Sequence, residues 1–223
     1  MKGTMRGIAV SLLLVGASVA VTACQSDPDI DITKLGFESD PPDVLYKQGL
    51  ANMNAGNMTE ASRKFEAIDK QYPFTEWGQK ALVMQTFIAT RTNKNDVAIT
   101  NGSRFLRQYP RSKDAAYVQY MIGLAYSKQI SDVTQDQRAA QRTVEAMSKV
   151  VNDYPDSEYV ADAQAKIRFA RDQLAGREMQ VGRYYLERKE YLAAVSRFRI
   201  VVEQYQNTNQ IEMRIVAVPR VRT

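Results

Sequence analysis

Hydrophobic positions between residues 43 and 212 follow a helical period, and the same pattern occurs four times along the chain. Each copy ends at a tyrosine, which we call the turn tyrosine: Tyr72, Tyr109, Tyr154 and Tyr205. Mostly apolar or small residues stand four, seven and eleven positions before each of them. These offsets fall on one face of a helix with 3.6 residues per turn, so each copy predicts an amphipathic helix that ends near its tyrosine.

The residues after the turn tyrosines predict a turn and a second helix. Proline follows three of the four; it cannot continue a helix, and it disfavours α geometry at the residue before it. Two positions later stands a residue able to cap the next helix: Thr75, Ser112, Ser157 and Thr208. No segment alternates with period two, so we predict an all-α fold. Between Asp156 and Tyr205 two helices are expected to run together, with Gly176 and Gly182 as weak points.

The repeat resembles the tetratricopeptide repeat. In the first copy Gly49, Ala61, Phe65 and Pro73 stand where that motif has its Gly, Ala, Phe and Pro. Later copies depart from it, with replacements that include Gly102 for Phe, Thr143 for Ala and Gln206 for Pro. We therefore predict tetratricopeptide-like helix hairpins over residues 43–212, stacked in a superhelix whose last repeat is incomplete, and such arrays present extended binding faces.

The first 42 residues predict export and anchoring. Residues 1–23 combine a basic start with an uncharged apolar run too short to span a membrane comfortably, which is typical of a secretory signal. The run ends in small residues before Cys24, which resembles a bacterial lipobox, with cleavage between Ala23 and Cys24 and lipid attachment to Cys24. The alternative is a plain secretory signal that contains a cysteine. Residues 24–42 are acidic and proline-rich and predict a flexible tether, with docking of its apolar residues on a partner as the alternative.

Composition excludes several chemistries. The chain has no histidine and one cysteine, so it holds no histidine-based catalytic triad, no histidine-ligated metal and no intrachain disulfide. Its net charge of +5 comes from basic residues at the two ends, which argues against a nucleic-acid-binding face. Neither a phosphate-binding glycine loop nor a nucleophile elbow is present. We expect a non-catalytic protein without a cofactor; a murein-cleaving enzyme with paired carboxylates is the remaining catalytic alternative.

The lipobox, the acidic tether and the long-period repeats together resemble the BamD (ComL/YfiO) family, most closely in residues 46–74, 104–112 and 183–205. The resemblance implies a lipoprotein on the periplasmic face of the outer membrane, in the machinery that folds β-barrel proteins into it. Its implied partners are unfolded outer-membrane proteins, the central barrel-shaped assembly subunit and the other lipoproteins of the complex. Gln25, which is not aspartate, favours the outer membrane by the family's sorting rule. The alternative is a tetratricopeptide lipoprotein scaffold for cell-envelope and peptidoglycan maintenance.

The resemblance also implies two binding surfaces. The N-terminal repeats would form a pocket for extended segments of unfolded barrel proteins, with these candidate residues: Tyr46, Asn52, Phe74, Trp77, Arg91 and Tyr117. Packing between hairpins is the alternative role for each of them. The C-terminal repeats would dock on the central subunit, with Arg183, Tyr184 and Arg188 as candidates. A solvated face with an Arg183–Glu187 pair is the alternative there.

Residues 213–223 form a basic tail that departs from the family pattern. The tail contains no acid, and Pro219 falls where a helix interior is expected. We expect a frameshifted or truncated end, and a genuine short variant is the alternative. In either case the last hairpin should lack its cover, leaving an apolar face partly exposed around Val195, Phe198, Val201 and Val202.

Overall fold

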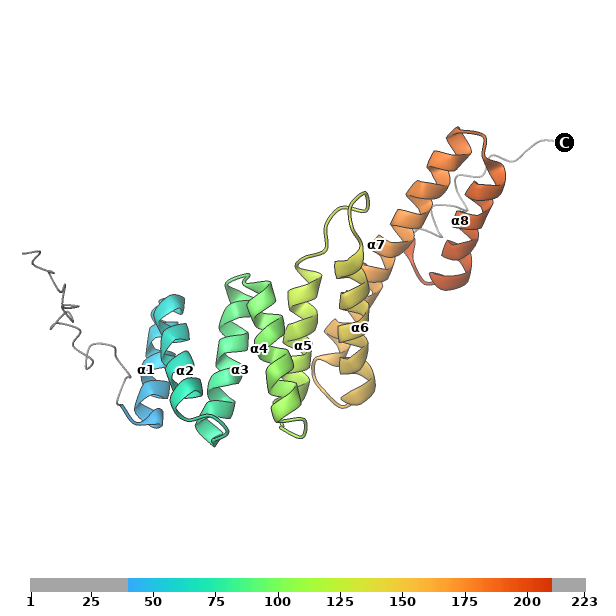
Figure 1. Ribbon diagram of the computed structural model, residues 1–223. Helices are drawn as coiled ribbons and strands as arrows, with labels where there is room; N and C mark the ends of the chain where they lie inside the picture. The colour runs from blue at the N-terminus through green and yellow to red at the C-terminus, as the bar shows by residue number, and fades with distance from the viewer. Residues whose placement is uncertain (1–39, 210–223) are drawn as a thin grey trace, which may run out of the picture. The chain divides into compact units, whose positions relative to one another are not determined.

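The computed structural model describes residues 40–209, which form eight α-helices and no strand (Figure 1). The signal segment, Cys24, most of the tether and the basic tail lie outside the described residues. The helices are α1 (Pro42–Asn54), α2 (Met58–Gln71), α3 (Glu76–Arg91), α4 (Asn95–Gln108), α5 (Ala115–Ser127), α6 (Arg138–Asp153), α7 (Val160–Glu187) and α8 (Tyr191–Gln204). None of these helices is both long enough and apolar enough to cross a membrane.

The helices form a stack of hairpins. Each helix packs against the next one in the chain, so the colours of Figure 1 run in order along the stack from blue to red. The odd-numbered helices also pack closely against one another, α1 with α3, α3 with α5 and α5 with α7. The even-numbered helices that the structure describes lie farther apart, although the side chain of Arg104 on α4 reaches Asp69 on α2. The odd-numbered helices thus form one layer and the even-numbered helices a second, which confirms the predicted tetratricopeptide-like architecture.

Every even-numbered helix ends at its turn tyrosine, as predicted. Tyr72, Tyr109 and Tyr154 are the C-caps of α2, α4 and α6, with φ between −126° and −135° and ψ between 49° and 59°. Tyr205, which precedes Gln206 instead of a proline, has nearly the same geometry at φ −126° and ψ 39°. The turn therefore does not depend on the proline.

The predicted caps are right in one copy and wrong in two. The Thr75 hydroxyl accepts a hydrogen bond from the Gly78 amide at 3.1 Å and caps α3. Ser112 and Ser157 instead accept from the amides two residues on, at 3.2 and 3.3 Å, and each closes a small turn. Because these turns intervene, α5 and α7 each begin two residues later than a serine cap would place them.

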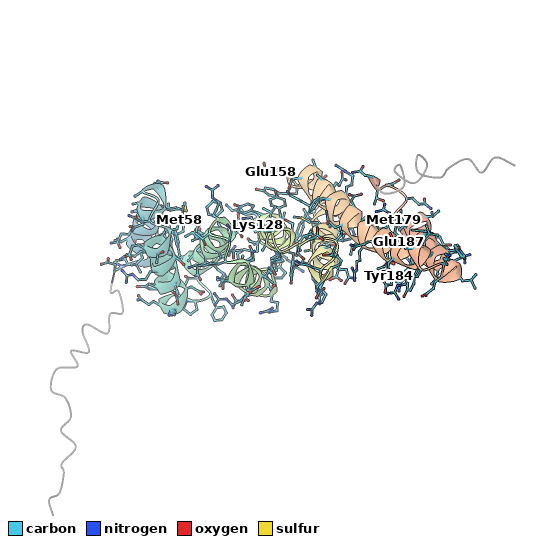
Figure 2. The ribbon with its side chains drawn as sticks, turned by 90° about the horizontal axis from the view of Figure 1, so that it is seen from above. Met58, Lys128, Glu158, Met179, Tyr184 and Glu187 are labelled. Carbon is cyan, nitrogen blue, oxygen red and sulfur yellow. The ribbon has the colours of Figure 1, made fainter. Side chains whose placement is uncertain are left out.

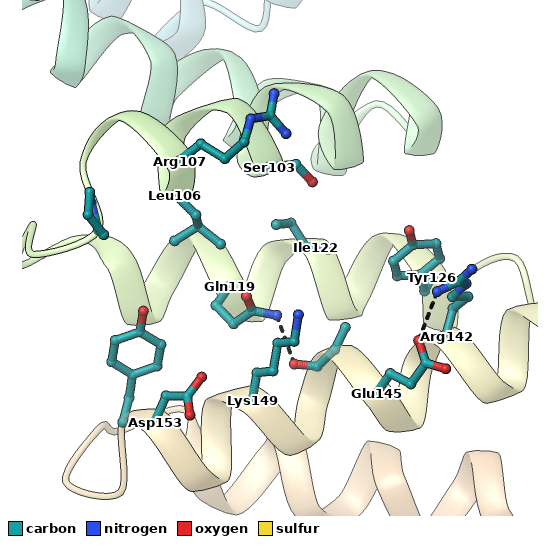
Figure 3. Close-up of a pocket in the computed structure, with 13 residues that line it drawn as sticks. Ser103, Leu106, Arg107, Gln119, Ile122, Tyr126, Arg142, Glu145, Lys149 and Asp153 are labelled. Carbon is teal, nitrogen blue, oxygen red and sulfur yellow. Dashed lines mark hydrogen bonds and ion pairs between the residues drawn. The ribbon is translucent and has the colours of Figure 1, made fainter.

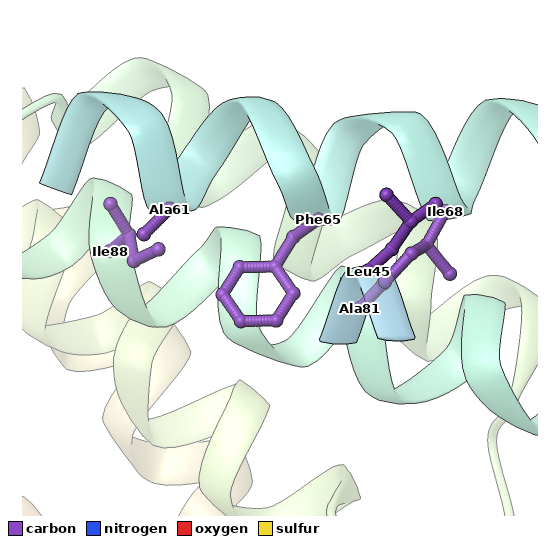
Figure 4. Packing of buried hydrophobic residues seen from close by; sticks show 6 residues of the cluster. All are labelled: Leu45, Ala61, Phe65, Ile68, Ala81 and Ile88. Carbon is purple, nitrogen blue, oxygen red and sulfur yellow. The ribbon is translucent and has the colours of Figure 1, made fainter. Parts of the chain in front are cut away.

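Phe65 shows how a hairpin is locked (Figure 4). Its ring projects from α2 into the core formed with α1 and α3 and is fully buried among Leu45, Ala61, Ile68, Ala81 and Ile88. A Cβ atom on Gly49 of α1 would stand 2.7 Å from this ring. Only glycine lets the two helices approach with the phenylalanine between them, as the repeat motif predicts.

The long helix α7 runs without interruption through Gly176 and Gly182. Both glycines are buried, and a Cβ atom on Gly182 would stand 2.4 Å from the Phe198 ring of α8. The prediction that two helices run together here is confirmed, and neither glycine breaks the helix; Gly182 allows α8 to pack closely.

The predicted uncovered face of the last hairpin is confirmed in part. On α8, Val195 is 53% exposed and Val202 is 41% exposed. Phe198 is half-buried. The prediction was wrong for Val201, which is fully buried because it points towards α7 and packs with Ala175 and Met179.

Candidate peptide-binding face

Two groups of aromatic side chains lie on the odd-numbered helices. The first joins α1 and α3, with the Tyr46 and Trp77 ring centroids 5.6 Å apart. Tyr46 also meets Phe65 edge-on at 5.3 Å. The Lys80 ammonium lies 4.9 Å from the centre of the Trp77 ring. Tyr46 and Trp77 are half-buried, so this group combines a firm base in the core with an accessible apolar surface.

The second group joins α5 to the start of α7. Tyr159 stacks on Tyr120 with the ring centroids 4.9 Å apart and lies tilted against Tyr117 at 5.2 Å. The Tyr120 hydroxyl donates a 2.7 Å hydrogen bond to Asp162. Burial raises the pKa of Tyr120, and the contact with Asp162 raises it further. Burial and, after it, a hydrogen bond to Glu158 raise the pKa of Tyr159 to about 12. Both phenols are therefore neutral donors at physiological pH.

The charge of Asp114 acts on both groups. Burial is the main reason that the pKa values of Tyr46 and Tyr159 are raised, and the charge of Asp114 raises both further. Asp114 also helps to raise the pKa of Lys80, although the hydrogen bond to Glu76 contributes more. Because α1 packs on α3, α3 on α5 and α5 on α7, residues from these helices around Asp114 share one surface.

Cations flank this surface. The Arg91 guanidinium lies 6.0 Å from the centre of the Phe87 ring at the end of α3. Burial raises the pKa of Tyr117, and the charge of Arg91 opposes that shift, so Arg91 is close to Tyr117. We call the surface the aromatic face and define it by Tyr46, Trp77, Lys80, Arg91, Asp114, Tyr117, Tyr120 and Tyr159. It offers aromatic rings, the cations Lys80 and Arg91 and the carboxylate of Asp114, which suit an extended peptide with apolar side chains.

The structure brings four of the six predicted pocket residues to this face: Tyr46, Trp77, Arg91 and Tyr117. Asn52 donates to the Gln48 carbonyl within α1 at 2.9 Å, so its amide binds its own helix. Phe74 lies in the turn between α2 and α3, at φ +62°, with its side chain 76% exposed. These two residues are not part of the aromatic face.

Sequence reasoning missed Lys80, Asp114, Tyr120 and Tyr159, although the repeat carries a signal for most of them. Positions five and eight after successive turn tyrosines hold Trp77 and Lys80, then Asp114 and Tyr117, then Tyr159 and Asp162. These positions occupy the same face of α3, α5 and the start of α7. Aligning the copies on the turn tyrosine thus identifies the face without a structure.

The predicted docking residues lie at the end of α7. The side chain of Tyr184 is half exposed (Figure 2), and the Arg188 guanidinium lies 4.5 Å from the centre of its ring. Arg183 is also exposed. The alternative Arg183–Glu187 ion pair does not occur in the part of the chain that the structure describes. Exposed apolar side chains of α7 and α8 continue this surface, and we call them the distal patch: Leu186, Tyr191, Leu192, Val195 and Val202.

Comparison with known proteins adds a family and several relatives. The YfiO family, described as outer membrane lipoproteins, matches residues 38–219. The outer membrane protein assembly factor BamD of Caulobacter vibrioides is 36% identical over 91% of this chain, and the match spans 65% of that protein's length. BamD of Rickettsia prowazekii is 31% identical over 89% of this chain and 76% of its own length. A tetratricopeptide protein of Thermus thermophilus aligns with a TM-score of 0.43 and 14% identity, over 79% of this chain and 97% of that one.

Proposed function

This chain belongs to the YfiO family of outer membrane lipoproteins, and from that membership we propose that it is a non-catalytic subunit of the machinery that assembles β-barrel proteins in the outer membrane. It binds segments of unfolded barrel proteins and scaffolds its complex. Cys24 carries the lipid that anchors it to the periplasmic face of the membrane, and residues 24–42 tether the repeats to that anchor.

The observation that carries the proposal is the aromatic face. Strands of barrel proteins alternate apolar and polar side chains, and aromatic girdles border their apolar bands. An unfolded segment of this kind is extended and amphipathic. The rings of Trp77 and Tyr117 can receive its apolar side chains, while Lys80, Asp114 and the raised-pKa phenols bind its polar groups.

The distal patch supports the second part of the proposal. A scaffold needs a second surface so that one partner can be held while another is bound. The exposed apolar side chains of α8, with Tyr184 and Arg188, provide the aromatic, arginine-containing chemistry that is enriched at protein interfaces. We assign docking on the central barrel-shaped subunit to this patch.

Site-specific photocrosslinking tests the proposal. A benzophenone amino acid is placed at Trp77 or Tyr117 in the lipidated protein, and at the exposed Val97 on α4 as the matched control. We expect crosslinks from Trp77 and Tyr117 to newly exported barrel proteins, and few from Val97. Equal crosslinking from all three positions would contradict a peptide site on the aromatic face.

Affinity purification separates the proposal from its competitor. Recovery of the central assembly subunit from detergent-solubilised envelopes is the expected result. Recovery of peptidoglycan-linked proteins in its place would favour the cell-envelope scaffold. Cys24→Ser should release the protein from the membrane fraction, and retention of this variant would contradict the lipid anchor.

A further inference from the structure

Three grooves recur on the even-numbered helices, each floored by an odd-numbered helix. The first, of about 650 Å³, lies between α2 and α4 over α3. The second, of about 450 Å³, lies between α4 and α6 over α5 (Figure 3). The third, of about 290 Å³, lies between α6 and the turn after α8, over α7. The repeat architecture thus provides the same site three times with different side chains.

The first two grooves contain charges of both signs. In the first groove Arg104 pairs with Asp69 across α2 and α4 at 2.5 Å. In the second Arg142 pairs with Glu145 at 2.9 Å, as the dashed line in Figure 3 marks, and Asp153 adds another carboxylate. Because acids of the protein already line these grooves, they offer little net attraction to an added carboxylate.

The third groove differs because none of the residues between 40 and 209 that line it is acidic. Arg168 and Arg171, three residues apart on α7, both contribute to its wall. Neither arginine forms an ion pair with any residue between 40 and 209, and both are exposed. Arg171 and Tyr205 line the same groove. Burial and, after it, the charge of Glu178 raise the pKa of Tyr205, and the charge of Arg171 opposes this shift; Glu178 itself is paired with Arg197 at 3.0 Å.

The remaining walls of the third groove supply hydrogen bonds and a small apolar area. Amide side chains come from all three elements, with Asn152 on α6, Gln164 on α7 and Asn207 in the turn after α8. Val151 and Ile167 provide the apolar part. A guanidinium binds a carboxylate through two parallel hydrogen bonds, and side-chain amides pair with a peptide backbone.

We propose that the third groove is a docking site for an acidic peptide segment of a partner protein, with an aspartate or glutamate side chain bound between Arg168 and Arg171. The amides and the apolar area favour a peptide over a phosphate-bearing headgroup, for which charge alone would suffice. The site is separate from the aromatic face and from the distal patch, and it does not rest on the function proposed above.

A binding experiment with the full-length chain in detergent tests this assignment. The probe is a fluorescein-labelled nine-residue peptide that alternates aspartate and valine, and its asparagine–valine counterpart measures binding without charge. The variant is Arg168→Gln with Arg171→Gln. The matched control removes two cations from the second groove, Arg107→Gln with Lys149→Gln.

We expect the aspartate peptide to lose about tenfold or more in affinity for the Arg168/Arg171 variant and less than about twofold for the Arg107/Lys149 control. Equal losses in both variants would show attraction by net charge alone and overturn the proposal. Binding of the asparagine peptide as tightly as the aspartate peptide would also overturn it. So would anionic phosphatidylglycerol vesicles that bind through Arg168 and Arg171 while the peptide does not.

Discussion

The first and the last described hairpins share the same contact between a glycine and a phenylalanine, but they bury the phenylalanine to different extents. Gly49 faces Phe65 in the first, and Gly182 faces Phe198 in the last, with the same sixteen-residue spacing. Phe65 is fully buried because α2 is packed against both α1 and α3. Phe198 is only half-buried, because among the described helices α8 packs against α7 alone. The glycine–phenylalanine contact therefore forms within one hairpin, but the phenylalanine is fully buried only where the next hairpin packs on it.

The largest expected effect follows from truncating the two phenylalanines. Phe65→Ala should lower the free energy of unfolding by about 3–5 kcal/mol, because it leaves a cavity in a closed core. Phe198→Ala should cost only about 1–2 kcal/mol, since part of its ring is already in water. Urea unfolding followed by circular dichroism measures both. Equal losses would mean that packing of the next hairpin does not increase the contribution of the phenylalanine to stability.

Adding a methyl group to each glycine should give a smaller difference. Gly49→Ala places its Cβ 2.7 Å from a ring held on all sides, and should cost about 1–3 kcal/mol. Gly182→Ala meets a ring that can turn towards the open side of α8, and alanine favours the helix by about 0.5–1 kcal/mol. We expect a change near zero for Gly182→Ala in the same urea titration. A greater loss at Gly182 than at Gly49 would contradict this account.

The stability of the aromatic face should depend on pH. Burial raises the pKa values of Tyr120 and Tyr159, that of Tyr159 to about 12, so the folded state keeps these protons after the unfolded chain loses them near pH 10. The resulting stability is fully present below pH 10 and is lost as the pH rises through 12. Tyr159→Phe should make the fall between pH 10 and 12 less steep. An unchanged slope in Tyr159→Phe would contradict the prediction.

The smallest stability effect is expected in the distal patch. Leu192 is 90% exposed in the first turn of α8, where an acidic residue is favourable, so Leu192→Asp should change the free energy of unfolding by less than about 0.5 kcal/mol. The same substitution should reduce recovery of the central assembly subunit in affinity purification. Val97→Asp, on the exposed face of α4, serves as the control. Unchanged recovery with Leu192→Asp would remove the patch from the docking surface.

The repeat pattern was sufficient to predict the fold but not its boundaries. Helix ends at the four turn tyrosines and the packing of Gly49 on Phe65 follow from periodicity and residue size. The starts of α5 and α7 do not follow from that pattern. The hydroxyls of Ser112 and Ser157 accept hydrogen bonds within a turn, and spacing alone does not distinguish such a turn from a helix cap. The burial of Val201 also required knowledge of which face of α8 meets α7.

Half of the residues that define the aromatic face were predicted from the sequence. Tyr46, Trp77, Arg91 and Tyr117 were chosen by chemistry, and the structure brings them together. Chemistry also selected Asn52 and Phe74, which the hairpin turns and helix direction take away from that surface. Asp114 and Tyr159 were missed because each looks ordinary within its own copy, and only the offset from the turn tyrosine relates them.

The unbroken course of α7 has a mechanical consequence. At 1.5 Å per residue its 28 residues span about 42 Å. Asp162, near one end, binds Tyr120 of the aromatic face, and Tyr184, near the other, belongs to the surface beside α8. In the proposed function this unbroken helix would keep the two bound partners at a constant separation, as a ruler does. Lengthening this ruler by one turn would change their spacing by about 5.4 Å while leaving each contact surface intact.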